Sequence, residues 1–130
     1  MPEWRFAFSG ISVNDIDAAR RFYGEVLGLA VKDEMGGLRV TLPGGGDLWI
    51  YPKTDHEPAT FTVLNLVVSG IDVAVDQLNA AGVDTRIYGE GEYGTDAKGI
   101  ARGRSANRGP DIAWFRDPAG NVLAVVDPGD

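Results

Sequence analysis

Residues 13–19 of this chain read VNDIDAA and residues 68–74 read VSGIDVA, so the second stretch nearly repeats the first. Farther along, residues 42–48 read LPGGGDL and residues 117–123 read DPAGNVL. Each stretch of the first pair follows an apolar run and opens a segment with helical periodicity, and each of the second pair has the Pro and Gly residues of a turn between strands. The sequence therefore predicts one structural unit that occurs twice.

The two pairs of matching stretches are not equally spaced. The first pair lies 55 residues apart and the second pair 75, so the second unit should carry about 20 additional residues between its helix and its final hairpin. Segment 88–110 supplies them. Because it holds six glycines and lacks sustained helical or strand periodicity, we expect a long, mobile loop inserted into the second unit.

Local signals predict the same order of elements in both units. Asp15 can cap a first helix that Gly28 ends, and a second apolar stripe begins at Ile71 and stops before Gly82. Strands are predicted, from β-branched and aromatic content between turns, at 5–13, 37–42, 47–52, 61–68, 84–88, 111–116 and 122–127. Each unit therefore has a strand, a helix and two or three further strands.

In a unit of this size, one helix covers only one face of a small sheet and leaves the other face bare. Pairing two such units can cover the bare faces. The sequence predicts a single α+β domain, residues 1–130. Within it, two βαβββ units, 5–58 and 61–128, form a curved mixed sheet around a central trough, with the helices outside.

The bulk composition excludes several function classes. The formal net charge of −7 leaves little basis for neutralising phosphates, so we expect no nucleic acid and no membrane partner. The absence of cysteine excludes disulfides and thiolate metal sites. No secretion pattern opens the chain and no apolar run reaches the roughly 18 residues of a membrane span, so a cytoplasmic location is expected.

The duplicated layout resembles the vicinal oxygen chelate superfamily, which includes glyoxalase I, extradiol dioxygenases and bleomycin-binding resistance proteins. The motifs that carry the resemblance are VNDID at 13–17, RFYGEVLGL at 21–29 and FRDPAGN at 115–121. They occur in this order, and the match spans nearly the whole chain.

The resemblance also implies where a metal would bind. Metal-using members place ligands, usually His, Gln or Glu, on the first and last strand of each unit. The matching positions here are Phe8, Trp49, Val63 and Ala124, and none of these side chains binds metals. We interpret the single histidine, His56, as a solvated loop residue. The resemblance is therefore to a metal-free branch of drug-binding resistance proteins, with no cofactor.

Side chains alternate between the two faces of a strand, so these positions fix which neighbours point into the trough. The candidate ligand-binding residues are Phe8, Arg39, Trp49, Tyr51, Val63, Asn65, Trp114 and Ala124. The aromatic rings suit a flat ligand, with Asn65 and Arg39 as polar groups that orient it. The same rings could instead fill the trough, and the backbone could satisfy Asn65. By the same alternation, Leu48 and Ile50 should pack under a helix.

The leading hypothesis is non-catalytic binding and sequestration of a flat aromatic small molecule, as in antibiotic resistance. One alternative is a metal-independent enzyme acting on a small aromatic substrate; another is a metal-dependent enzyme of the glyoxalase or dioxygenase type. The stretch GEGEYG at 89–94 matches a dinucleotide-binding pattern, but no helix follows it and its two glutamates would repel pyrophosphate. Besides the small ligand, a homodimer is expected, as is common in the family.

Overall fold

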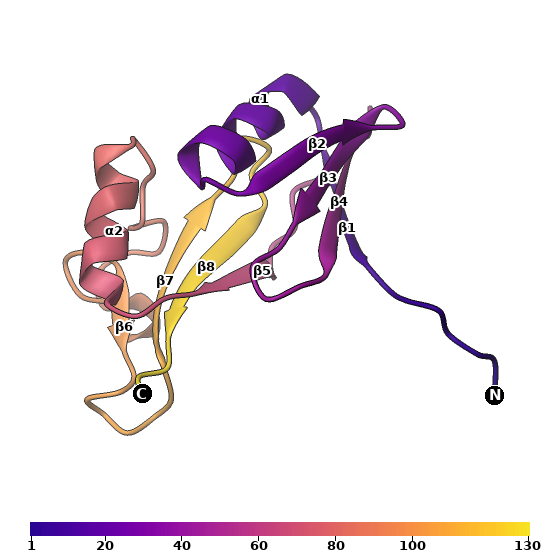
Figure 1. Ribbon diagram of the computed structural model, residues 1–130. Coiled ribbons are helices and arrows are strands. Elements are labelled where there is room, and N and C mark those ends of the chain that lie inside the picture. Colours follow the sequence, from indigo (N-terminus) through magenta and orange to yellow (C-terminus); the bar gives the residue numbers. More distant parts are fainter. The chain divides into compact units, whose positions relative to one another are not determined.

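Each half of the chain contains one four-stranded mixed sheet with a helix against one of its faces (Figure 1). The computed structural model describes all 130 residues. The chain forms two compact units, unit 1, Met1–Pro58, and unit 2, Ala59–Asp130. The predicted α+β class with two βαβββ units is confirmed. No helix in the chain has the length and apolar sequence that a membrane crossing requires.

Unit 1 has its sheet in the order β1-β4-β3-β2, with β1 parallel to β4 and the other neighbours antiparallel. Its elements are β1 (Ser9–Val13), α1 (Ile16–Arg21), the short π-helical η1 (Phe22–Val26), β2 (Ala30–Glu34), β3 (Gly37–Thr41) and β4 (Asp47–Pro52). As predicted, Asp15 caps α1, and its carboxylate accepts a hydrogen bond from the Ala18 N–H at 3.1 Å.

The core of unit 1 lies between its sheet and α1. Alternate residues of β3 and β4 are fully buried there: Leu38, Val40, Leu48 and Ile50. Because β3 and β4 both contact α1, the prediction that Leu48 and Ile50 pack under a helix is confirmed. We call the opposite face, which carries Trp49 and Tyr51, the open face of unit 1.

Unit 2 repeats this plan, with its sheet in the order β5-β8-β7-β6 and β5 parallel to β8. Its elements are β5 (Thr62–Val67), α2 (Ile71–Ala80), the 3₁₀ turn η2 (Glu92–Gly94), β6 (Ile100–Arg102), β7 (Asp111–Arg116) and β8 (Val122–Asp127). Gly70 stands at the N-cap of α2 and has no side chain to cap it. The carboxylate of Asp127 accepts hydrogen bonds from the N–H groups of Gly70 and Ile71 instead, at 3.1 and 3.3 Å.

The strand registers confirm the duplication position by position. In unit 1, Trp49 lies opposite Arg39 on one side, and opposite Gly10 on the other. In unit 2, Ala124 lies in the same way opposite Trp114 and Asn65. We call these the central rows of the two sheets.

The predicted strands differ from the observed strands at four places. The first strand begins at Ser9, not at residue 5, because its partner β4 starts at Asp47 and leaves the preceding residues nothing to pair with. Segment 84–88 forms only an isolated bridge, between Arg86 and Trp114. The strands β2 and β6 were not predicted, since both are short edge strands whose stability comes from the neighbouring strand rather than from their own sequence.

Segment 88–110 is also not the structureless loop that was predicted. It contains β6, where Ile100 is fully buried, and ion pairs tie it to α2. The guanidinium of Arg102 donates hydrogen bonds to both carboxylate oxygens of Asp72, at 2.7 and 2.9 Å, and to Asp96 at 3.0 Å. Lys98 adds an ion pair to Asp76 at 2.8 Å. The hydrogen bonds from Arg102 hold the pKa of Asp72 well below its usual range.

Candidate functional site

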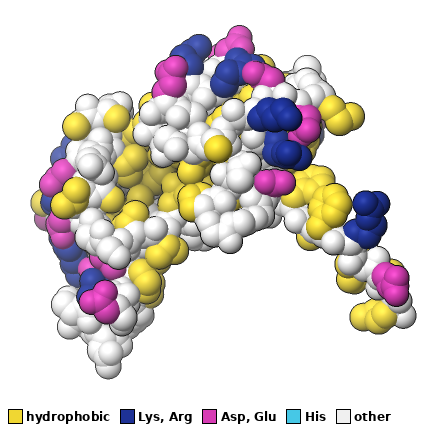
Figure 2. Space-filling model, in the orientation of Figure 1, with side chains coloured by type: hydrophobic (Ala, Val, Ile, Leu, Met, Phe, Trp, Pro, Cys, Tyr) yellow, Lys and Arg dark blue, Asp and Glu magenta, His cyan; other side chains and the backbone are white.

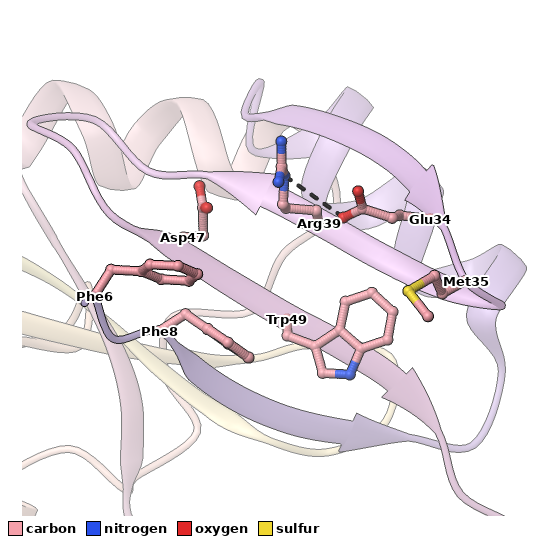
Figure 3. Close-up of a pocket in the computed structure, with 7 residues that line it drawn as sticks. All are labelled: Phe6, Phe8, Glu34, Met35, Arg39, Asp47 and Trp49. Carbon is pink, nitrogen blue, oxygen red and sulfur yellow. Dashed lines mark ion pairs between the residues drawn. The ribbon is translucent and has the colours of Figure 1, made fainter. Parts of the chain in front are cut away.

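A pocket of about 220 Å³ lies in unit 1, where the open face meets the hairpin between β2 and β3 (Figure 3). Its lining combines aromatic and charged side chains: Phe6, Phe8, Glu34, Met35, Arg39, Asp47 and Trp49. Figure 3 shows the three rings along one side of the pocket and the charged groups along the other.

The indole of Trp49 occupies the space that a side chain at Gly37 would fill. A Cβ atom at Gly37 would lie 2.6 Å from Cη2 of the Trp49 indole and 2.6 Å from the carbonyl oxygen of Ile50. Such distances are far below normal contact, so the indole lies directly on the backbone of β3 only because residue 37 has no side chain.

The other two rings come from the segment that precedes β1. In Figure 2 this N-terminal segment carries hydrophobic side chains that are open to solvent. Phe6 is 75% exposed and Phe8 is 61% exposed, although both line the pocket. The guanidinium carbon of Arg5 lies 5.9 Å from the centre of the Phe6 ring, within the range of a cation–π contact.

The charged residues of the pocket are not equivalent. Nε of Arg39 lies 3.6 Å from a carboxylate oxygen of Glu34, so these two charges pair with each other. The carboxylate of Asp47, which is half-buried, has no ion-pair or hydrogen-bond partner in the structure. The pocket wall therefore retains one unpaired negative charge.

Met35 forms the rim of the pocket from the tight turn between β2 and β3. Both central residues of this turn have positive φ, 51° at Met35 and 82° at Gly36, as a two-residue hairpin of type I′ requires. The turn leaves the Met35 side chain almost fully exposed.

Unit 2 presents a different surface at its central row. Trp114 packs against two tyrosines of segment 88–110, with its ring centre 5.5 Å from that of Tyr88 and 5.9 Å from that of Tyr93. The two tyrosine rings are 4.8 Å apart. Tyr93 has left-handed backbone geometry, with φ 55° and ψ 21°. Within unit 2, the indole of Trp114 is therefore covered by residues of its own chain.

The structure brings some of the predicted site residues together. Phe8, Arg39 and Trp49 line one pocket. Tyr51 lies on the same open face of β4 but does not line that pocket.

The other four predicted residues lie in unit 2. Asn65, Ala124 and Trp114 share the central row; Asn65 is exposed and Ala124 is fully buried, while Val63 is half-buried on β5.

The candidate list omitted Phe6, Glu34, Met35 and Asp47, which also line the unit 1 pocket. Gly36-Gly37 is a turn signal in the sequence, but the run before it, AVKDE at 30–34, is mostly charged, so the sequence holds no strand signal for this hairpin.

His56 is not the solvated loop residue that was predicted. It is half-buried, and its Nδ1 lies 2.7 Å from Oγ of Ser12 in a hydrogen bond. A turn places it there, because the His56 N–H donates to the carbonyl of Lys53, and the Lys53 N–H donates to that of Val13. No group of three or more His, Asp or Glu side chains is arranged to hold a metal ion.

Residues 5–125 match the family model described as the Glyoxalase/Bleomycin resistance protein/Dioxygenase superfamily. The chain belongs to this superfamily. The resemblance inferred from its motifs is thereby confirmed at the level of the superfamily. No curated protein matches the sequence.

Solved structures of other proteins share the fold. TnmS3, an antibiotic binding protein from Streptomyces sp. CB03234, is 20% identical with a TM-score of 0.66, and the match covers 98% of this chain and 100% of that one. The oxidase ChaP-H2 is 20% identical with a TM-score of 0.64, covering 97% and 96%. A glyoxalase family protein from Bacillus anthracis is 18% identical with a TM-score of 0.65, covering 99% and 100%. At these identities the likeness concerns the fold alone.

Proposed function

We propose that this superfamily member binds a flat aromatic small molecule in the unit 1 pocket and sequesters it without chemical conversion. The observation that carries the proposal is the grouping of three rings around one pocket: Phe6 and Phe8, which are exposed, and Trp49, which is half-buried. Exposed apolar rings that gather at a cavity are typical of ligand sites, because covering them removes apolar surface from water. Stacking on a ring adds about 0.5–1.5 kcal/mol for a well-placed pair.

The size of the pocket limits what it can enclose. At about 220 Å³ it is smaller than the roughly 300–1,000 Å³ of pockets that enclose a drug-sized ligand. We therefore propose that it takes one planar ring system, while the rest of a larger molecule remains outside.

A role in antibiotic resistance is part of the proposal. It is supported by the shared fold with TnmS3, which is described as an antibiotic binding protein. Sequestration requires only that the ligand is bound, and the aromatic rings of the pocket provide apolar surface for binding. We also propose a homodimer in the cytoplasm, since each sheet has two edge strands with no neighbouring strand on their outer side, and such edges favour pairing.

A second candidate function is a metal-independent enzyme. The observation that favours it is the hydrogen bond between Ser12 and His56, because this pairing can activate a serine hydroxyl as a nucleophile. The similar structure of an oxidase, ChaP-H2, also shows that the fold is compatible with catalysis. Neither Ser12 nor His56 lines the aromatic pocket, however, so binding is the better-supported function.

The proposal is tested by titrating polycyclic aromatic compounds, including aromatic antibiotics and flavins, into the protein. Binding is followed by tryptophan emission and by calorimetry. We expect saturable binding that Trp49→Ala weakens by about 1–3 kcal/mol, the range of stacking anchors. Trp4→Ala is the matched control, because Trp4 is 80% exposed and lies outside the pocket. Chromatography should recover the ligand unchanged. Conversion of the ligand that Ser12→Ala abolishes would support the enzyme, and absence of binding by every planar compound would refute the proposal.

A further inference from the structure

We propose that the unit 1 pocket selects planar aromatic molecules that carry a positive charge, such as a protonated amine or ring nitrogen. This inference rests on the proposed function and names the ligand class of the same pocket. It depends on how the charges and rings that line the pocket are arranged.

The carboxylate of Asp47 gives the pocket an unpaired negative charge. The other acid of the pocket, Glu34, already faces Arg39 at 3.6 Å, so that pair contributes no net charge. Asp47 has no such partner and is half-buried beside the rings. A cationic ligand would supply the missing partner, whereas an anionic ligand would meet repulsion from Asp47 and an arginine that is already paired.

The aromatic rings of the pocket favour the same class of ligand. The faces of Phe6, Phe8 and Trp49 carry the negative part of the ring quadrupole, so they attract cations as well as flat apolar surfaces. The chain shows this preference internally, since the guanidinium carbon of Arg5 lies 5.9 Å from the centre of the Phe6 ring. A planar cation satisfies the rings and the carboxylate together.

The net charge of the whole chain also favours a cationic ligand. With a formal net charge of −7, the protein attracts cations over a distance and repels anions before contact. This long-range attraction weakens with salt, while the contact with Asp47 is less sensitive because it is partly buried. The two contributions can therefore be separated experimentally.

The experiment compares two rigid three-ring probes by calorimetry at low and high salt. 9-Aminoacridine is a planar cation at neutral pH, and anthracene-9-carboxylate is a planar anion of similar size. We expect the wild-type protein to bind the cation at least about tenfold more tightly, a preference in the range of one cation–π contact. Asp47→Asn should reduce that preference by about fivefold at both salt concentrations.

Two further variants make the result specific. Glu25→Gln removes the same charge from η1, on the helical side of the sheet, and should leave the preference unchanged. Glu34→Gln releases Arg39 and should increase the affinity for anthracene-9-carboxylate.

Equal affinities for the two probes, or equal effects of Asp47→Asn and Glu25→Gln, would overturn this inference but leave the proposed function standing. If neither these probes nor any other planar compound binds, both fail.

Discussion

The central rows of the two sheets occupy equivalent positions but carry different side chains. In unit 1 the middle residue is Trp49, between Gly10 and Arg39, and its indole lines an open pocket. In unit 2 the middle residue is Ala124, and the indole of the row belongs to Trp114 and lies against two tyrosines. Both indoles are half-buried, but the one in unit 1 lines a pocket, while the one in unit 2 packs against rings of its own chain.

The difference arises from segments outside the paired strands. The rings that complete the unit 1 pocket, Phe6 and Phe8, precede β1, and the rings that cover Trp114 come from segment 88–110. The duplicated sheet decides which positions face outward, and the flanking segments decide whether those positions stay open. Three changes test this comparison, and they are ordered by the size of the expected effect.

The largest effect is expected from Gly37→Ala. The new Cβ would meet the Trp49 indole and the Ile50 carbonyl at 2.6 Å, so the ring must leave its place on β3. Overpacking of this kind costs about 1–3 kcal/mol of unfolding free energy, and loss of the stacking ring should weaken binding of 9-aminoacridine by about tenfold or more. Thermal unfolding and calorimetry measure the two effects.

Gly10→Ala is the control for Gly37→Ala. Its Cβ would lie 3.7 Å or more from its neighbours, which is ordinary contact, so both quantities should change little. If Gly37→Ala behaved like Gly10→Ala, the glycine would have no role in placing the indole.

A smaller effect is expected from Trp114→Ala, and it should be an effect on stability. Removing the indole leaves Tyr88 and Tyr93 without their shared partner. Because Trp114 is only half-buried, we expect a loss of about 2–3 kcal/mol of unfolding free energy, below the roughly 3–5 kcal/mol of a fully buried ring. Affinity for a planar ligand should be unchanged. If calorimetry shows that Trp114→Ala weakens binding as much as Trp49→Ala does, the ligand site is not confined to unit 1.

The smallest expected effect is the loss of unfolding free energy in acid, when the ion pairs of segment 88–110 are weakened. The pKa of Asp72 is lowered by hydrogen bonds from Arg102, so its stabilising contribution is complete above the ordinary pKa of about 3.9 and is lost as the pH falls below it. Since the Asp72 side chain is half exposed, the contribution should be under about 1 kcal/mol.

Urea unfolding at pH 7 and pH 3, followed by Trp114 emission in a Trp4→Phe, Trp49→Phe background, measures this contribution. Asp72→Asn should reduce the difference in unfolding free energy between pH 7 and pH 3. Asp84→Asn, the control, removes an exposed carboxylate that does not pair with Arg102, and should reduce that difference less. Equal changes would show that the ion pairs with Arg102 do not stabilise unit 2.

The sequence predicted the duplicated framework because the repeat is a local pattern. The spacing of the matched stretches placed Arg39 and Trp114 at equivalent positions, and the registers confirm it. The ligand positions implied by the family resemblance also identified Phe8 and Trp49, which line one pocket.

The remaining pocket residues depend on contacts between distant parts of the chain. Glu34 and Met35 reach the pocket through a hairpin turn, and Asp47 through the pairing of β3 with β4. The tyrosines over Trp114 belong to an insertion with no counterpart in unit 1, so comparison of the repeats gave no information about them.

The backbone of Tyr93 limits how firmly Trp114 is covered. A left-handed conformation costs a residue with a side chain roughly 1–2 kcal/mol, which is comparable to the 0.5–1.5 kcal/mol that a well-placed ring pair returns. Gly91 and Gly94 on either side also have positive φ and give the segment other conformations to adopt. The Tyr93 ring is itself 65% exposed, so little buried surface opposes its release. Opening of this cover therefore requires far less free energy than unfolding of the sheet beneath it, and hydrogen exchange in residues 91–94 should be correspondingly fast.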